Sequence, residues 1–214
     1  MLRDLRITEI FYSLQGEART VGWPTVFVRL TGCPLRCRYC DTAYAFQGGE
    51  RVSIAGILEK VSNYTPRFVT VTGGEPLAQP AVLLLLRELC DQGYEVSLET
   101  SGALSTRDID PRVSVVLDLK TPGSGESARN LYENVDRLRA VDQVKFVITN
   151  AEDYEWAREA VDKYQLTQCC DVLFSPAQGS LAAQDLADWI LRDRLAVRFQ
   201  IQLHKVLWGD TRGR

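Results

Sequence analysis

The sequence predicts an α/β fold: a partial, open parallel β/α barrel, abbreviated to a single domain over residues 1–214. Two observations carry this prediction. Short apolar runs rich in Val, Ile and Phe alternate with longer runs of helical period, which is typical of crossover units around a parallel sheet. In addition, 214 residues suffice for one complete core, and no shift in composition marks a domain boundary.

The expected elements follow from these runs in chain order. Gly, Pro, Ser or Asp bound each apolar run, as strands require. We expect strands at 25–30, 68–72, 95–99, 113–119, 143–148, 171–174 and 197–203, the last closing one edge of the sheet. Helices are expected at 53–62, 80–92, 130–138, 151–164 and 182–192. Helix 80–92 has Pro80 in its first turn and Gly93 after its end. Its apolar positions, which trace one face, are Val82, Leu83, Leu86 and Leu89.

Composition excludes several classes of protein. A hydrophobic fraction of 45% and a charged fraction of 25% argue against disorder and collagen-like structure. The net charge of −3 argues against a protein that coats nucleic acid. The longest apolar stretch, residues 81–86, is too short to span a bilayer, and residues 1–6 lack the apolar core of an export signal. We therefore expect no nucleic-acid or membrane partner and a cytoplasmic location.

The six cysteines are the most informative residues, because closely spaced thiols in a reducing compartment usually serve a metal or catalysis. Cys33, Cys37 and Cys40 follow a strand, with three and then two residues between them. Three thiolates suit an iron–sulfur cluster with one iron left open. A structural zinc, the first alternative, requires four ligands. The sequence disfavours it, because the sole histidine is His204 and no second CxxC occurs. Inert thiols are the other alternative. The three other cysteines are expected to be ordinary structural residues: Cys90, Cys169 and Cys170.

Two motifs together resemble the radical S-adenosylmethionine (SAM) superfamily. The first is the cysteine trio with Tyr39 before its last member, and the second is Val-Thr-Gly-Gly-Glu-Pro at residues 71–76. The resemblance implies that SAM binds the open iron, that the glycine backbone meets its methionine amino group, and that Tyr39 packs on adenine. Two glycines at a strand end fit such a close approach. A simple turn that needs positive φ is the alternative interpretation.

Over almost its whole length the chain is similar to the 7-carboxy-7-deazaguanine synthase family. The similar segments are residues 8–17, 22–30, 98–102, 118–120 and 203–210. The resemblance implies a lyase of queuosine-type biosynthesis. Its substrate would be 6-carboxy-5,6,7,8-tetrahydropterin, contracted to 7-carboxy-7-deazaguanine with release of ammonia. A radical formed from SAM would abstract hydrogen at C6, and SAM would be regenerated.

The resemblance also implies site residues, most of them directly after strands, where parallel barrels build their sites. The SAM contacts would be Gly74, Glu99, Ser101, Asp118, Leu119, Lys120, Phe174, Ser175, Pro176 and Ala177. The substrate contacts would be Leu14, Gln15, Gly16, Arg29, Thr72 and Arg214, and Thr42 would hold magnesium. From the residues alone, Arg29 and Lys120 could instead be solvated charges, and Asp41 with Thr42 could cap the next turn.

His204, as the sole histidine, is a candidate catalytic base. We favour the alternative that it only ends the last strand beside the site. The resemblance further implies a homodimer, and a flavodoxin or ferredoxin is a plausible electron donor. Two rival functions stay open at this point: an activase that installs a glycyl radical on a partner protein, and a non-enzymatic zinc or iron–sulfur scaffold.

Overall fold

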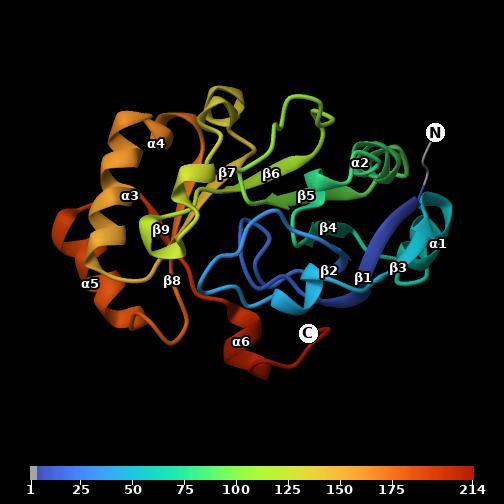
Figure 1. The fold of residues 1–214 in the computed structure, drawn as a ribbon, viewed down its shortest axis with the longest axis horizontal. Coiled ribbons are helices and arrows are strands. Elements are labelled where there is room, and N and C mark those ends of the chain that lie inside the picture. The colour runs from blue at the N-terminus through green and yellow to red at the C-terminus, as the bar shows by residue number, and fades with distance from the viewer. Residues whose placement is uncertain (1–3) are drawn as a thin grey trace.

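The computed structural model describes residues 4–214, so residues 1–3 of the segment examined for an export signal lie outside the described residues. A single nine-stranded sheet has the order β3-β1-β2-β4-β5-β6-β7-β8-β9 (Figure 1). From β2 through β4 to β9 every neighbouring pair is parallel, whereas β1 is antiparallel to both β2 and β3. The expected α/β class with an open, mainly parallel sheet is confirmed.

Six of the expected strands form within two residues of the expected bounds. The strands are β1 Asp4–Leu14, β2 Pro24–Leu30, β3 Glu50–Ser53, β4 Phe68–Gly73, β5 Glu95–Thr100, β6 Ser114–Asp118, β7 Gln143–Ile148, β8 Asp171–Pro176 and β9 Arg198–Phe199. The expected strand 197–203 is wrong in length, since β9 holds only two residues. Sequence reasoning missed β1 and β3.

The helices confirm four of the five expected ones. They are α1 Ile54–Ser62, α2 Val82–Asp91, α3 Ala151–Lys163, α4 Leu166–Cys169, α5 Ala183–Asp193 and α6 Leu203–Trp208. The expected α-helix 130–138 is wrong, because the 3-10 helix η5 (Tyr132–Arg137) occupies that segment. Buried Asn134 explains the difference: its side chain bonds Thr106, Gly102 and Leu104 of the preceding loop and ties the segment into tight turns.

Short 3-10 helices fill the other connections: η1 Ala43–Phe46, η2 Pro76–Ala78, η3 Pro122–Ser124 and η4 Ser127–Arg129. Helix α2 starts two residues later than expected. Its fully buried residues are Val82, Leu85, Leu86 and Leu89, so the expectation missed Leu85, while Leu83 is half-buried and packs against the same core cluster.

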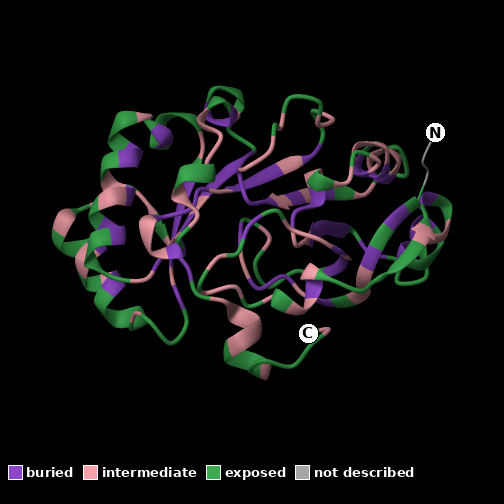
Figure 2. Ribbon diagram, in the orientation of Figure 1, coloured by how far each residue is buried: buried purple, intermediate pink, exposed green. Residues whose placement is uncertain are grey.

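The two faces of the sheet differ in chemistry because successive side chains alternate. One face is apolar, and Figure 2 shows buried residues running along the strands. Strand residues of that face form one core cluster with residues of α1 and α2, and a second with residues of α3 and α5. On the opposite face, polar side chains interrupt the apolar pattern, notably Arg29, Thr72, Glu99, Asp118 and Lys145. These five lie on five neighbouring strands and supply the wall of the site.

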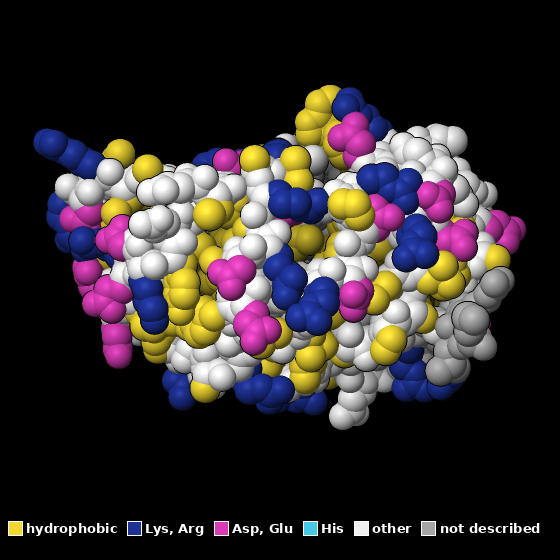
Figure 3. Space-filling model, turned by 90° about the horizontal axis from the view of Figure 1, so that it is seen from above, with side chains coloured by type: hydrophobic (Ala, Val, Ile, Leu, Met, Phe, Trp, Pro, Cys, Tyr) yellow, Lys and Arg dark blue, Asp and Glu magenta, His cyan; other side chains and the backbone are white. Residues whose placement is uncertain are grey.

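The surface carries both signs of charge. Figure 3, viewed from above, shows Lys and Arg side chains interspersed with Asp and Glu. Within residues 4–214 no helix has the length and apolar character needed to cross a membrane.

Candidate active site

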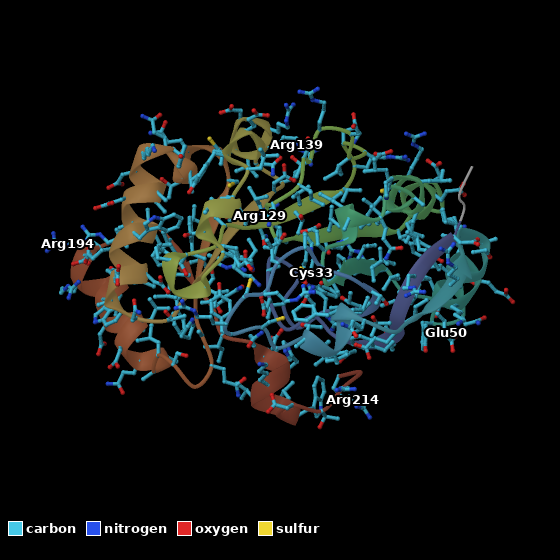
Figure 4. All side chains as sticks on the ribbon, viewed as in Figure 1. Cys33, Glu50, Arg129, Arg139, Arg194 and Arg214 are labelled. Carbon is cyan, nitrogen blue, oxygen red and sulfur yellow. The ribbon has the colours of Figure 1, made fainter. Side chains whose placement is uncertain are left out.

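A cavity of about 610 Å³ opens beside the polar face of the sheet, at the carboxyl ends of the parallel strands. Ligand pockets of enzymes fall in this size range. Its wall combines the cysteine loop after β2, the strand ends of β4 to β8, and the C-terminal segment from α6 onward. In Figure 4, Cys33 lies in the middle of the molecule and Arg214 at its lower edge.

The cysteine loop is held by its backbone and by one apolar anchor. Gly32 N donates to Ala45 O at 2.8 Å, and Arg38 N donates to Ser124 O at 3.0 Å. Leu35, between the first two cysteines, is 1% exposed and fixes the loop against the interior. All three thiols, those of Cys33, Cys37 and Cys40, line the cavity and are half-buried.

The thiol arrangement fits an iron–sulfur cluster. Burial raises the pKa of each thiol, that of Cys37 to about 11, so a positively charged metal group is what would favour the thiolates. In the described part of the chain, no three His, Cys, Asp or Glu side chains converge to hold a single metal ion. Three thiols that share one cavity without converging suit a group of several irons, in which each thiolate takes one iron.

The two glycines after β4 bring backbone against backbone. Gly73 has a φ of +143°, and a Cβ there would collide with the backbone of Leu30. A Cβ on Gly74 would collide with Gly32 O and would lie 2.9 Å from Cys33 Cβ. The glycine pair therefore lies directly on the cysteine loop. The positive φ of the turn is confirmed at Gly73, and Gly74 makes its close approach to the cysteine loop; the contact of this backbone with SAM stays a prediction.

Glu75, which follows the glycines, is a buried hub that sequence reasoning left without a role. Its carboxylate is fully buried and accepts hydrogen bonds from Leu77 N, Thr100 Oγ1, Ser101 N and Ser101 Oγ. This arrangement fixes the end of β5 against the glycine turn. Ser101, an expected SAM contact, lines the cavity, but its hydroxyl is engaged by Glu75 at 2.5 Å.

The strand ends expected to bind SAM surround one polar corner of the cavity. Lys120 Nζ lies 3.0 Å from Asp118 Oδ2 and 6.0 Å from the centre of the Tyr39 ring. Burial opposes the charge of Lys120, but Asp118, Tyr39 and Cys37 together outweigh burial and raise the pKa of Lys120. Lys120 is thus a buried, paired cation, and the alternative of a solvated lysine is wrong. Two buried atoms in this corner have no partner within residues 4–214: Asp118 Oδ1 and Tyr39 OH.

Such orphaned polar atoms are costly unless a bound group satisfies them, so the corner fits a polar ligand. Ser175 and Pro176, which end β8, and Ala177, which follows it, line the same cavity. The side chains of Leu119 and Phe174 instead belong to the core cluster on the other face of the sheet. Only backbone atoms of these two residues are therefore available for a contact with SAM, which stays a prediction.

Arg29 is a part-buried cation, not a solvated one. Its Nε donates to Glu9 Oε1 at 2.7 Å, and its side chain is 17% exposed. Tyr44 OH donates to the same carboxylate oxygen at 2.8 Å. In the described residues the two terminal nitrogens of Arg29 make no hydrogen bond, and Arg29 lines the cavity. Such a fork suits a carboxylate.

The expected substrate residues Gln15 and Thr72 meet through Glu99. Thr72 Oγ1 donates to Glu99 Oε2 at 2.8 Å, and Gln15 Nε2 donates to Glu99 Oε1 at 3.4 Å and to Thr70 Oγ1 at 3.0 Å. Burial raises the pKa of Glu99, although Lys145 opposes that shift. Glu99, expected among the SAM contacts, is therefore bonded to two residues expected to bind substrate.

The remaining expected residues surround the cavity. Leu14 and Arg214 line it, and the Arg214 guanidinium lies 6.0 Å from the centre of the Trp208 ring. Gly16 is buried and packs on His204, where a Cβ would collide with the imidazole. His204 lies in α6 and lines the cavity, so its expected position at the end of a strand is wrong.

Thr42 does not cap the following helix with its side chain. It occupies the N-cap position of η1, but its hydroxyl donates to Asp41 Oδ1 at 2.7 Å. Burial opposes ionisation of Asp41, but hydrogen bonds from Thr42 and Gln202 and the charge of Lys205 hold the pKa of Asp41 below its ordinary value. An ionised carboxylate and a hydroxyl on the cavity wall are oxygen ligands of the kind that magnesium accepts.

Sequence reasoning missed a buried ion pair that joins distant segments across the cavity. Lys145 Nζ lies 2.7 Å from Glu17 Oε2 and 3.6 Å from Asp118 Oδ2. Burial opposes the charge of Lys145, but Glu17, Asp118 and Glu99 hold its pKa well above the usual range. The one signal that could have found Glu17 is its place directly after Leu14-Gln15-Gly16. Lys145 carried no signal.

The other cysteines stay apart from the cavity. Cys90 packs against the cluster of α1 and α2, and Cys170 against that of α3 and α5. Cys169 is exposed at the end of α4, so it is not a core residue.

Comparisons with known proteins match this geometry. The family model of the radical SAM superfamily matches residues 27–163. The chain is 44% identical to a 7-carboxy-7-deazaguanine synthase of Chlorobaculum tepidum, over 98% of this chain and 97% of that protein. It is 41% identical to one of Koribacter versatilis, over 98% of this chain and 100% of that protein.

Two solved structures show the same fold. QueE from Escherichia coli has a TM-score of 0.78 at 24% identity and covers 94% of this chain and 95% of that one. Streptococcus suis SuiB bound to S-adenosylmethionine has a TM-score of 0.58 at 16% identity, over 80% of this chain and 45% of that one.

The open barrel and its three-cysteine loop define a radical SAM enzyme, the class to which this chain belongs. That class implies a 4Fe–4S cluster and SAM. The three thiols fit the cluster, and Gly73 and Gly74, which we call the glycine cradle, fit SAM. Within the class, the chain belongs to the 7-carboxy-7-deazaguanine synthase family.

Proposed function

We propose that this chain converts 6-carboxy-5,6,7,8-tetrahydropterin to 7-carboxy-7-deazaguanine and ammonia, as a step of queuosine-type biosynthesis in the cytoplasm. One observation carries the proposal: a single cavity of this family member unites the thiol trio, the glycine cradle and a polar strand wall with a free arginine fork. The geometry joins a place for a redox cluster to a place for a planar, carboxylated substrate.

Cys33, Cys37 and Cys40 would hold a 4Fe–4S cluster through three thiolates. Together, the bound cluster and SAM supply hydrogen-atom abstraction at the pterin carbon that carries the carboxylate. The backbone of Gly74 would accept the amino group of SAM, because no side chain stands between it and the cysteine loop. Asp118 Oδ1, which lacks a partner within residues 4–214, would accept a hydrogen bond from the same ligand.

The substrate would lie between the cysteine loop and the β1–β2 connection. Arg29 would bind the carboxylate through its two terminal nitrogens, while Glu9 holds the Nε edge and fixes the plane of the fork. Leu14 and Gly16 offer backbone groups, Thr72 and Gln15 offer polar side chains, and Arg214 adds a cation at the rim. Held in one orientation, the substrate would present a single hydrogen atom for abstraction.

A magnesium ion would bind at Thr42, with Asp41 beside it and the substrate carboxylate completing the site. Magnesium is commonly held by one or two protein oxygens together with substrate and water. The lowered pKa of Asp41 keeps a negative charge available there at neutral pH. The role is to orient the carboxylate while the ring contracts. We further propose that the chain works as a homodimer and takes its electron from a flavodoxin or ferredoxin.

Mass spectrometry of the anaerobic reaction tests the function directly. The reconstituted protein, the carboxypterin, SAM and reductant should yield a product lighter than the substrate by ammonia. Cys37→Ala should lose iron and activity while its far-UV circular dichroism stays unchanged. Cys90→Ala, on α2 away from the cavity, is the matched control and should keep both. Unconsumed carboxypterin, with a fully loaded cluster, would overturn the proposal.

A further inference from the structure

Two backbone N–H groups of the cysteine loop are held by a segment far along the chain. Arg36 N donates to Glu126 Oε1 at 2.6 Å, and Arg38 N donates to Ser124 O at 3.0 Å. Arg36 and Arg38 flank Cys37, the middle residue of the thiol trio, on either side. The position of Cys37 therefore depends on residues 121–126, which we call the clamping turn.

The clamping turn begins directly after a strand end of the site. It follows Lys120, whose amine pairs with Asp118 in the polar corner of the cavity. Ser124 is fully buried, and its Oγ donates to Thr121 O at 2.6 Å. Glu126 N in turn donates to Ser124 Oγ at 3.0 Å. The clamping turn is thus a compact unit that joins the corner expected to bind SAM to the cysteine loop.

One buried carboxylate connects the clamping turn to the next strand and helix. Asp153 is 1% exposed, and its Oδ1 accepts a hydrogen bond from Gly123 N at 2.7 Å. Its Oδ2 accepts hydrogen bonds from Thr149 N at 3.0 Å and from Thr149 Oγ1 at 2.5 Å. Thr149 follows β7, and Asp153 lies in the first turn of α3. The carboxylate therefore joins two segments whose bonded residues, Gly123 and Asp153, are 30 positions apart in the sequence.

Helix α3 does not use this carboxylate for its own N-terminal cap. Asn150 Oδ1 provides the cap and accepts a hydrogen bond from Asp153 N at 2.9 Å. Within residues 4–214, no Lys, Arg or His side chain lies at ion-pair distance from Asp153. A buried charge without a cation is costly unless hydrogen bonds offset the cost. Gly123 and Thr149 supply those bonds, so the carboxylate fixes the clamping turn against the end of β7.

The contact between the clamping turn and Asp153 leaves no free space. A Cβ on Gly123 would collide with Thr149 Oγ1 and with Asp153 Oδ2. On the other side of the turn, Arg38 lies against Gly125, with its Nε 3.3 Å from where a Cβ would stand. The turn is therefore packed between Asp153 and the cysteine loop. Figure 4 labels Arg129, three residues beyond the turn, beside Cys33 in that view.

We propose that Asp153 is a positioning residue, which acts through the clamping turn to hold Cys37 in place for the cluster. Asp153 does not line the cavity, so it touches neither SAM nor substrate. This inference deepens the proposed function, because it rests on a cluster held by the three cysteines. Replacing a residue that orients a metal ligand typically lowers metal affinity by about 10–100-fold. The same displacement would move the cysteine loop away from the corner of Lys120 and Asp118.

Iron release tests the proposal without turnover. Asp153→Asn keeps the size of the side chain, but its amide nitrogen cannot accept a hydrogen bond, so Gly123 N or Thr149 loses its acceptor. In the reconstituted, anaerobic protein, the iron chelator ferrozine should withdraw iron at least about tenfold faster from Asp153→Asn than from the wild type.

SAM binding and steady-state kinetics separate positioning from a general loss of structure. The change that SAM causes in the electron paramagnetic resonance spectrum of the reduced cluster should need about tenfold more SAM in Asp153→Asn. The KM for the carboxypterin should stay unchanged, because Arg29 and Thr72 lie on β2 and β4, away from the clamping turn. A higher KM with wild-type SAM binding would contradict the proposal.

Asp142→Asn is the matched control. Asp142 is also a buried carboxylate that accepts backbone hydrogen bonds, from Val115 N and Arg139 N at 2.9 Å each. It lies before β7, whereas Asp153 lies after it, and it does not line the site cavity. Both variants should lose stability in urea, but only Asp153→Asn should release iron faster. Equal release rates in the two variants, or a wild-type rate in Asp153→Asn, would overturn the proposal.

Two further variants keep the test decisive if Asp153→Asn does not fold. Gly123→Ala breaks the same contact from the side of the turn, so its iron release should rise to the same extent. Glu126→Ala removes the acceptor of Arg36 N and should also release iron faster, whereas Glu126→Gln keeps an oxygen acceptor and should retain the wild-type rate. Wild-type release in Gly123→Ala would refute the role of Asp153.

Failure of this inference and failure of the proposed function give different results. A wild-type protein that converts the carboxypterin, together with unchanged iron release in the Asp153 and Gly123 variants, refutes only the positioning role. A wild-type protein that holds its cluster and binds SAM but leaves the carboxypterin unchanged refutes the proposed function.

Discussion

At the residue scale, the site depends on positions where the backbone itself comes close. Gly74 touches the backbone of the cysteine loop, and Glu75 beside it collects hydrogen bonds from the end of β5. Neither residue needs to react with a ligand in order to matter. Together they set the distance between the cysteine loop and the strand ends.

Gly74→Ala should therefore abolish SAM binding and lower the iron content. The added methyl group would collide with Gly32 O, a backbone atom that cannot rotate away as a side chain could. Iron analysis and SAM titration measure the effect. Gly56→Ala adds the same methyl group inside α1, with its nearest neighbours at 3.3 and 3.4 Å, and should leave both properties unchanged. Normal SAM affinity in Gly74→Ala would refute the hypothesis that SAM binding needs the close approach of Gly74 to the cysteine loop.

His204 makes a prediction about pH. Burial lowers its pKa below the ordinary value of 6.5, although Glu17 and Asp41 oppose the shift. The unfolded chain then binds the proton more tightly than the folded one. The contribution to stability is present above pH 6.5 and is lost as pH falls through the folded-state pKa.

Urea unfolding should therefore show a steeper loss of stability in the wild type than in His204→Gln between about pH 7.5 and pH 5. Both proteins are compared as the cluster-free form, so that iron loss does not contribute. Identical slopes for the two proteins would contradict a buried, neutral imidazole.

At the scale of elements, the open side of the barrel is joined by loops. The connection after β1 meets the segment before α6: Ala18 N donates to Gln200 Oε1 at 2.9 Å, and Leu203 N donates to Gly16 O at 3.0 Å. Helix α6 is thereby held against the same connection that carries Gln15. These two hydrogen bonds therefore hold in place the residues on the substrate side of the cavity.

Gly16→Ala should raise the KM for the carboxypterin while SAM affinity stays unchanged. The new methyl group would collide with the His204 ring and displace α6 from the β1–β2 connection. Steady-state kinetics measure the effect. Gly16→Ala/His204→Ala removes the colliding ring. The double variant should therefore lose less free energy of unfolding than the sum of the losses in the two single variants. Strict additivity would show that the two residues do not touch.

How far the elements could be predicted depended on their patterns. The parallel strands β4 to β8 were all predicted, because each is a short run that contains Val, Ile, Leu or Phe, in β5 alternating with polar residues, and is bounded by turn residues. By contrast, the strand β1 was missed, because its burial alternates only at the start and then becomes half-exposed. Residues 197–203 alternate like a strand, yet the chain leaves the sheet at Gln200 to bond Ala18, a contact between residues 182 positions apart that no local pattern reveals.

The residues of the site divide in the same way into those that the sequence could predict and those that it could not. The thiol trio and the glycine pair are contiguous motifs, so the sequence identified them together with Arg29. The pair of Glu17 and Lys145 spans 128 positions and exists only because β7 places Lys145 opposite Asp118 in the sheet. The secondary-structure propensities of the residues carry no information about such a pairing. Buried charges of this kind need the topology before they can be found.

At the scale of the whole molecule, two core clusters lie on one continuous sheet. One packs under α1 and α2, the other under α3 and α5. Strands β5 and β6 join the two halves through four paired positions. We predict that the described chain unfolds as one cooperative unit, in agreement with the single domain expected from the sequence.

Leu86→Ala and Leu186→Ala test this cooperativity, since each removes a fully buried side chain from a different cluster. Each should lower the free energy of unfolding by about 2–5 kcal/mol. In a background in which Trp23, Trp156 and Trp208 are replaced by Phe, the fluorescence of Trp189 reports on the second cluster, and its urea midpoint should shift in both variants as far as the midpoint by circular dichroism does. A Trp189 signal that ignores Leu86→Ala would indicate two independent units.

The two outermost strands of the sheet are also its shortest. Strand β3 has four residues and begins with charged Glu50 and Arg51, and β9 has only two residues. A long bare margin would invite a neighbouring molecule to add its own strand, the first step toward insoluble fibres. Strands β3 and β9 themselves offer too little margin for such growth; within the described residues the longer margin is the half of β1 from residue 8 to 14, which pairs with β2 but not with β3, so a charged substitution there is the change that would keep this protein dispersed at high concentration.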